Sequence, residues 1–144
     1  MSEQPDNQQE TPDVIIVQGN GVDYAQQIKV GDHCFSADEP VSLGGGNTGP
    51  TPYDLLLGAL GSCTSITMTM YARRKEWPVE NITVRLRHRK EKDEHGKPLD
   101  VIEREIEIAG ELSAEQRKRL LEVAERCPVH RTLSNAVKIV TTSL

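Results

Sequence analysis

Aromatic side chains are scarce in this chain, and their scarcity argues against one class of function. They make up 3% of the 144 residues, namely Tyr24, Phe35, Tyr53, Tyr71 and Trp77. Proteins that bind single-stranded nucleic acids stack bases on several exposed aromatic rings. A net charge of −5 also opposes binding to a phosphate backbone. We therefore expect a largely aliphatic core and no nucleic-acid partner.

The chain also lacks the patterns of exported and membrane-spanning proteins. Residues 1–13 are polar and contain no apolar core for the export machinery to recognise, so we expect a disordered tail. Segment 55–72 is uncharged but contains two glycines and several hydroxyl side chains. It is predicted to be a buried helix rather than a membrane span. We expect a cytoplasmic protein with free thiols and no membrane partner.

Motifs for metals and nucleotide cofactors are missing as well. No CxxC or HxxxH pair offers zinc-ligand spacing. The Gly-rich segment 41–52 has neither the Lys-Ser/Thr pair of a P-loop nor a GxGxxG pattern, and we interpret it as a flexible loop that borders the active site. A Cys/His hydrolase is disfavoured because no third group that would orient a histidine can be identified. We expect no cofactor and no metal.

Alternating patterns predict two sets of antiparallel strands. Short apolar runs at 14–17, 24–30 and 33–38 are separated by Gly-containing turns, which is typical of a three-stranded meander. Segments 81–92 and 101–109 alternate in polarity, with arginines on the outer face of the first and glutamates on that of the second. This arrangement favours cross-strand ion pairing over nucleic-acid binding.

A long helix is predicted over residues 52–75. Thr51 and Asp54 have the spacing of a capping box at its start, and the Trp77-Pro78 pair ends it. Apolar side chains occur all around this helix, which predicts that it is covered on most sides. Small residues at 58–63 would let another helix approach closely.

A second helix and a final strand complete the predicted fold. Ser113 and Gln116 form another capping box, and the apolar stripe of this helix ends at Cys127, before a proline. Segment 137–142 is predicted to be the last strand. The order of elements is typical of an α+β fold with antiparallel sheets packed on a buried helix, and residues 14–144 are predicted to form a single domain.

Two of the three cysteines are candidates for redox chemistry. Cys63 lies in the long helix and Cys127 ends the stripe of the second, so both are predicted to point inward. One thiolate could attack the O–O bond of a peroxide and become a sulfenic acid, and the other could condense with it to a disulfide. The alternative is that buried cysteines only fill space, which is the interpretation we favour for Cys34.

The sequences GPTPYDLLLGALGSCTSITMTMYA and CPVHRTL resemble motifs of the family of osmotically inducible protein C (OsmC) and organic hydroperoxide resistance protein (Ohr). The resemblance covers nearly everything after the N-terminal tail. It implies an α+β fold with antiparallel sheets on long buried central helices, and an intertwined homodimer with its sites at the subunit interface. It also implies a peroxiredoxin-like thiol peroxidase that protects against oxidative stress. Cys63 would attack an organic hydroperoxide, Cys127 would resolve the product to a disulfide, and a small or protein-bound dithiol would reduce that disulfide.

Two features depart from the family pattern. Peroxidase members resemble one another in carrying a glutamate where this chain has Tyr53, and here a carboxylate, Asp54, lies one position later. They also carry an arginine in the N-terminal strands, which is absent here. Another cation must then support the thiolate, and the candidates are Arg73, Arg74, Arg126 and Arg131. Our hypothesis is Arg131, which lies close to Cys127 in the sequence. His130, Tyr53 and Asp54 are further candidates for support of the thiolate or the pocket. The departures keep open an alternative function, a non-catalytic or weakly catalytic protein that binds a small ligand in the same interface pocket.

Overall fold

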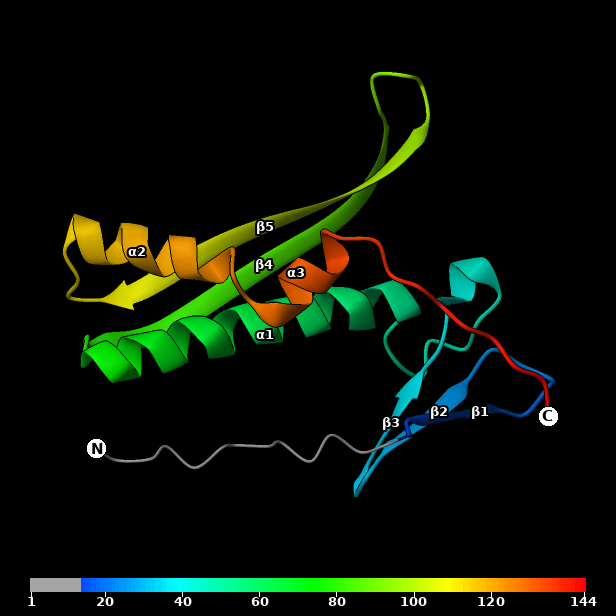
Figure 1. Cartoon of the computed structure of the whole chain (residues 1–144). Coiled ribbons are helices and arrows are strands. Elements are labelled where there is room, and N and C mark those ends of the chain that lie inside the picture. Colours follow the sequence, from blue (N-terminus) through cyan, green and yellow to red (C-terminus); the bar gives the residue numbers. More distant parts are fainter. Residues whose placement is uncertain (1–13) are drawn as a thin grey trace. The chain divides into compact units, whose positions relative to one another are not determined.

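The computed structural model describes residues 14–144, and the chain divides after Pro52 into two compact units. Each unit has its own antiparallel sheet (Figure 1). The α+β fold class with antiparallel sheets and a long helix is thereby confirmed. The predicted disordered tail, residues 1–13, lies outside the described residues, and a single domain over 14–144 stays a prediction.

The first unit contains the predicted meander. Its strands are β1 (Ile16–Gly19), β2 (Gln26–Val30) and β3 (His33–Ala37), paired antiparallel in this order. Gly31 makes the turn between β2 and β3 with a φ of 56°, a left-handed conformation that favours glycine. Ile28, at the centre of β2, is the residue of this strand whose side chain is buried.

A buried carboxylate organises the Gly-rich loop that follows β3 and includes a short 3₁₀ helix, Val41–Leu43. Asp38 Oδ2 accepts hydrogen bonds from Thr48 Oγ1 at 2.6 Å and from Thr48 N at 3.1 Å. Its Oδ1 accepts from Glu39 N at 2.8 Å. These bonds, above all that from the Thr48 hydroxyl, hold the pKa of Asp38 below its usual range. At Gly45 a Cβ would overlap the Glu39 carbonyl, so glycine is required there.

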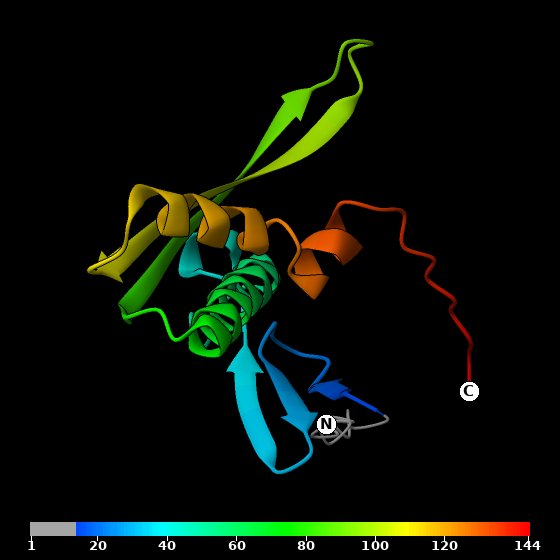
Figure 2. The same ribbon diagram turned by 60° about the vertical axis from the view of Figure 1, so that its left-hand side comes forward.

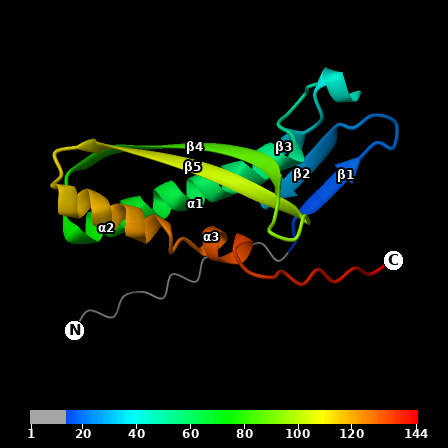
Figure 3. The same ribbon diagram turned by 90° about the horizontal axis from the view of Figure 1, so that it is seen from above.

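The second unit packs two helices on a long hairpin. Figures 1 and 3 show α1 running alongside the hairpin and α2 lying beside its end. The view along α1 shows α2 above it (Figure 2). The elements are α1 (Pro52–Lys75), β4 (Val79–Lys92), β5 (Pro98–Gly110), α2 (Ala114–Ala124) and α3 (Pro128–Leu133).

The core of this unit lies where α1 and α2 meet the inner face of the hairpin. Partly buried side chains from both strands surround it, and Tyr71 contacts Trp77 edge-to-face with ring centroids 5.5 Å apart. At Gly61 a Cβ would lie 2.7 Å from Leu86 Cδ1. Gly61 thus admits a side chain of strand β4, whereas the approach of another helix to the small residues of α1 stays a prediction. The buried core residues are Met68, Ala72, Leu120 and Ala124.

The outer face of the hairpin carries the predicted cross-strand ion pairs. Arg85 Nη1 lies 3.1 Å from Glu107 Oε2, and both side chains are more than half exposed. The remaining pairs are Arg87 with Glu105 and Arg89 with Glu103. This confirms that the basic run pairs with the neighbouring strand.

Helix α1 has the predicted bounds but is less covered than we expected. Five of its residues are buried, whereas Leu56, Ile66 and Met70 are exposed. Among the described residues it is the one helix that passes the length and composition test for a membrane span. Its buried side instead packs on the hairpin and α2. The prediction that α1 is covered on most sides is wrong for the single chain.

The C-terminal region differs from the prediction in two ways. The proline at 128 begins helix α3 instead of merely ending the helix before it. The predicted strand over 137–142 is absent, and Val137 and Ile139 in this segment are exposed. A strand needs a partner to satisfy its backbone groups, and within the described chain this segment has none.

Candidate active site

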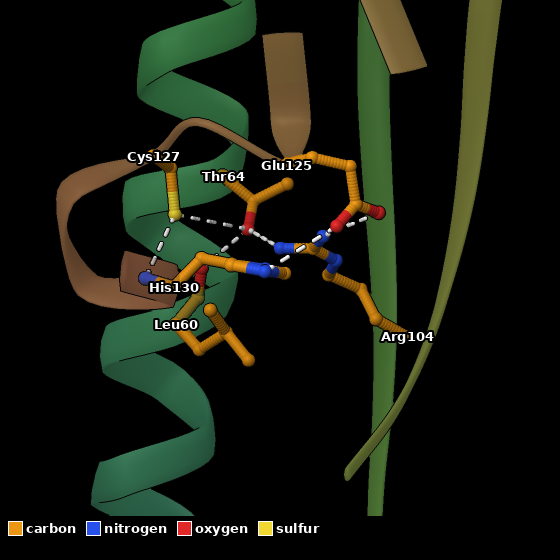
Figure 4. Close-up of polar contacts among 6 residues, drawn as sticks. All are labelled: Leu60, Thr64, Arg104, Glu125, Cys127 and His130. Atoms are coloured by element: carbon orange, nitrogen blue, oxygen red, sulfur yellow. Dashed lines mark hydrogen bonds and ion pairs between the residues drawn. The ribbon is translucent and has the colours of Figure 1, made fainter. Parts of the chain in front are cut away.

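The polar contacts of the site meet at Thr64, a fully buried residue of α1. Its Oγ1 donates to the Leu60 carbonyl at 2.6 Å and accepts from Arg104 Nη1 at 3.0 Å. Cys127 Sγ lies 3.9 Å from the same oxygen (Figure 4). One hydroxyl on α1 thus links strand β5 to the start of α3.

Cys127 is buried and is the N-cap of α3. Its Sγ accepts a hydrogen bond from His130 N at 3.3 Å, and Pro128 occupies the first turn, where its missing N–H has no cost. The prediction that Cys127 points inward is confirmed. Its placement on the stripe of α2 is wrong, because α2 ends at Ala124 and Cys127 follows it.

Arg104 is one of three residues of this site that the sequence interpretation missed, together with Thr64 and Glu125. Arg104 lies on the inner face of β5 between Ile102 and Ile106, and its side chain is only 9% exposed. Its Nη2 lies 3.4 Å from Glu125 Oε1, and Glu125 Oε2 lies 3.3 Å from His130 Nε2. The strand alternation could have revealed it, because Arg104 shares the parity of the inward isoleucines.

A cavity of about 410 Å³ opens beside this network. The apolar part of its lining comes from Leu60, Ile102 and Leu133. Its polar lining comes from Asp100, Arg104, Glu125, His130 and Ser134. A space of this volume is large enough for a small organic molecule and offers it both an apolar wall and hydrogen-bonding groups.

Cys63 is half-buried and lies on another side of α1 from Thr64. It is spaced seven residues from both Leu56 and Met70, so it shares their apolar, exposed face. Cys127 thus contacts Thr64, which is the residue that follows Cys63 in the chain. Both thiols are free.

Tyr53 and Asp54 lie in the first turn of α1. The Tyr53 ring stacks on His88, with centroids 4.6 Å apart and planes 15° apart. His88 Nε2 in turn lies 2.8 Å from Asp100 Oδ1, and this hydrogen bond is the main cause that lowers the pKa of Asp100. Because Asp100 lines the cavity, the structure connects Tyr53 to it through His88.

Arg131 and Cys34 make other contacts. Arg131 is exposed, and its carbonyl accepts from Asn135 Nδ2 at 2.7 Å. The guanidinium that reaches the Thr64 hydroxyl is that of Arg104, and support of a thiolate by Arg131 stays a prediction. Cys34 is exposed on β3, with its Sγ 3.5 Å from Gln27 Oε1. Within residues 14–144, no cluster of His, Cys, Asp or Glu side chains is arranged to hold a metal ion.

Solved structures with this fold come from several bacteria. An OsmC like protein from Mycoplasma pneumoniae matches with a TM-score of 0.70 and 20% identity, over 84% of this chain and 86% of that one. An organic hydroperoxide resistance protein OsmC from Legionella pneumophila matches with a TM-score of 0.63 and 15% identity, over 83% and 87%. The organic hydroperoxide resistance protein OhrB of Bacillus subtilis matches with a TM-score of 0.59 and 19% identity, over 83% of this chain and 87% of that one.

Comparison of the sequence with protein families points the same way. No curated protein sequence matches the chain. The sequence model of the OsmC-like proteins matches residues 44–142, which is well over half of the chain and includes both Cys63 and Cys127. The chain belongs to the OsmC-like protein family.

Proposed function

We propose that this protein is a thiol peroxidase that reduces organic hydroperoxides with the pair Cys63 and Cys127. The observation that carries the proposal is the contact of Cys127 Sγ with Thr64, the residue that follows Cys63 in α1. Consecutive Cα atoms are about 3.8 Å apart, so the second thiol sits next to the helical turn that carries the first. The organic hydroperoxide resistance proteins with the same fold support this choice of substrate.

The proposed reaction has three steps. The Cys63 thiolate attacks the terminal peroxide oxygen, the O–O bond breaks, and the departing alkoxide takes a proton and leaves as an alcohol. Cys63 is thereby oxidised to a sulfenic acid. Cys127 then attacks this sulfur, water leaves, and a disulfide forms. A small or protein-bound dithiol reduces the disulfide by exchange and returns both cysteines to thiols.

We further propose that the working form is a cytoplasmic homodimer. The face of α1 with Leu56, Cys63 and Met70 is apolar and exposed, and a second copy that covers it would enclose Cys63. The segment after α3 supports this proposal, because its exposed apolar residues Val137 and Ile139 gain a partner if another chain pairs with them. Sedimentation should give twice the mass of the chain, and a monomer at micromolar concentration would contradict this part.

Peroxide turnover with a dithiol reductant tests the proposal. Cys63→Ser should abolish consumption of cumene hydroperoxide. Cys127→Ser should lower the rate of turnover, because the Cys63 sulfenic acid must then react with the external dithiol instead of with a neighbouring thiol. Cys34→Ser is the matched control and should retain the wild-type rate, since Cys34 lies on the exposed meander. Unchanged turnover in Cys63→Ser would overturn the proposal.

The alternative is a protein that binds a small ligand in the same pocket and reacts with peroxide slowly or not at all. The cavity beside Arg104 and His130 favours it, because its mixed lining suits an organic ligand whether or not the thiols react. Tight binding of an unreactive alcohol in a protein that lacks turnover would support this function over the peroxidase.

A further inference from the structure

The hydrogen atoms around Thr64 fix the direction of each contact. A hydroxyl has one proton and can accept two hydrogen bonds. The 2.6 Å contact with the Leu60 carbonyl uses the proton, because a carbonyl can only accept. Arg104 Nη1 can only donate, so it takes one acceptor position of Thr64 Oγ1. The contact with Cys127 Sγ at 3.9 Å then falls at the remaining acceptor position, where a thiol S–H can donate to Thr64 Oγ1.

Removing the proton from Cys127 requires one rearrangement. The sulfur then needs donors, and His130 N already supplies one at 3.3 Å. Thr64 can supply a second by turning its hydroxyl proton from Leu60 to the sulfur. The Leu60 carbonyl keeps its ordinary helical partner, so this rotation leaves no buried group unpaired. Arg104 keeps donating to Thr64 Oγ1 in both states, and a cationic donor makes the hydroxyl that accepts from it a stronger donor in turn.

We propose that Arg104 is a positioning residue for Cys127. Arg104 acts through the Thr64 hydroxyl and favours the attack of Cys127 on the Cys63 sulfur. This inference rests on the cysteine pair of the proposed function, and it concerns the second, disulfide-forming step alone. The side chain of Arg104 is 9% exposed, so water screens its charge little, whereas its partner Glu125 is 65% exposed.

The step can be tested without any peroxide. The aromatic disulfide DTNB reacts with a thiolate to give a mixed disulfide and releases one coloured TNB anion. In the Cys34→Ser protein, DTNB should first modify Cys63. Cys127 then attacks the Cys63 sulfur, the bond to the aromatic sulfur breaks, and a second TNB leaves with its electron pair while the Cys127 proton goes to solvent. The second phase is independent of DTNB concentration, and Cys127→Ser should remove it.

Arg104→Gln should slow the second phase by about tenfold, which is the lower range for loss of a hydrogen bond to a charged group, and should leave the first phase unchanged. Thr64→Val should slow it similarly, and Thr64→Ser, which keeps the hydroxyl, should restore the rate. Arg85→Gln is the matched control, because Arg85 lies on the outer face of the same hairpin in an exposed ion pair. It should leave both phases unchanged.

The outcomes separate a positioning role of Arg104 from a purely structural one. A structural role would slow both phases or neither, and either result overturns the inference. A normal second phase in Arg104→Gln overturns it while leaving the peroxidase proposal intact. The wild-type protein could fail to consume peroxide while Arg104→Gln still slows the second phase. This result would refute the peroxidase proposal and support the positioning role. Absence of a second phase in the Cys34→Ser protein contradicts the cysteine pair itself.

Discussion

The two faces of the β4–β5 hairpin use arginine in opposite ways. On the outer face Arg85 pairs with Glu107, and both side chains are more than half exposed. On the inner face Arg104 is almost fully covered and binds a buried hydroxyl. The residue type is the same and the strands are adjacent, so the difference comes from the side of the sheet alone. Alternation along the strand thus decides whether an arginine is part of a solvated surface or of a site.

The contributions of the two arginines to the free energy of unfolding should differ for the same reason. An exposed ion pair gains little, because water and salt screen it and the side chains lose freedom when they pair. A covered guanidinium that loses its partner, or a buried hydroxyl that loses its donor, leaves a polar group without compensation. The following changes test how far this contrast between the faces holds.

The largest difference is expected between Arg104→Ala and Arg85→Ala. The first should lower the free energy of unfolding by about 2 kcal/mol, because it removes a charge-assisted hydrogen bond and the packing of a covered side chain. The second should change it by less than about 0.5 kcal/mol. Urea denaturation of both variants gives the comparison. Equal effects would show that burial does not distinguish the two faces.

A smaller effect is expected where α1 approaches the inner face. Gly61→Ala places a Cβ 2.7 Å from Leu86 Cδ1, and the forced shift of this side chain should cost about 1 kcal/mol net of the gain in helix propensity. Gly58→Ala is the matched control. No atom lies within 4 Å of its added Cβ, so the same exchange should stabilise the helix. Thermal unfolding should therefore show a lower Tm for Gly61→Ala and a higher Tm for Gly58→Ala than for the wild type.

The smallest effect concerns the pair of His88 and Asp100, where an inner-face ring meets an exposed carboxylate. The hydrogen bond from His88 lowers the pKa of Asp100 below its ordinary value of 3.8. A lowered pKa in the folded state contributes stability above pH 3.8, and this contribution is lost as the pH falls through the folded value. The difference between the urea unfolding midpoints of wild type and Asp100→Asn should therefore become smaller below about pH 4. A difference that is constant with pH would refute this linkage.

Local signals predict the elements of the fold well. The bounds of α1 follow from a helix start at Pro52 and a stop at Trp77-Pro78, and the Ser113 capping box marks the start of α2. These signals act within one or two turns of a helix, which is why one sequence suffices to read them. The predicted strand at 137–142 is wrong because alternation shows only that a segment can pair, and not that a partner is present.

The site is harder to predict because its residues meet through tertiary packing. Cys63 and Cys127 can be selected from the sequence as a candidate pair. The contact of Cys127 with Thr64, the chain neighbour of Cys63, depends on how α3 begins. A proline such as Pro128 can end one helix, but proline is also favoured at the first position of the next. Arg104 escapes notice because the neighbouring glutamates make its strand look like an ion-pairing surface.

The edge-to-face contact of Trp77 with Tyr71 also gives the molecule an optical probe of one part only. Trp77 is the sole tryptophan and belongs to the core between α1 and the hairpin. Its emission should therefore follow the melting of residues 53–144, the unit in which its contacts lie. Circular dichroism in the far ultraviolet averages over the backbone of the whole chain. Coincident transitions from the two signals would mean that both units unfold as one cooperative body, and separate transitions would mean that the meander melts independently.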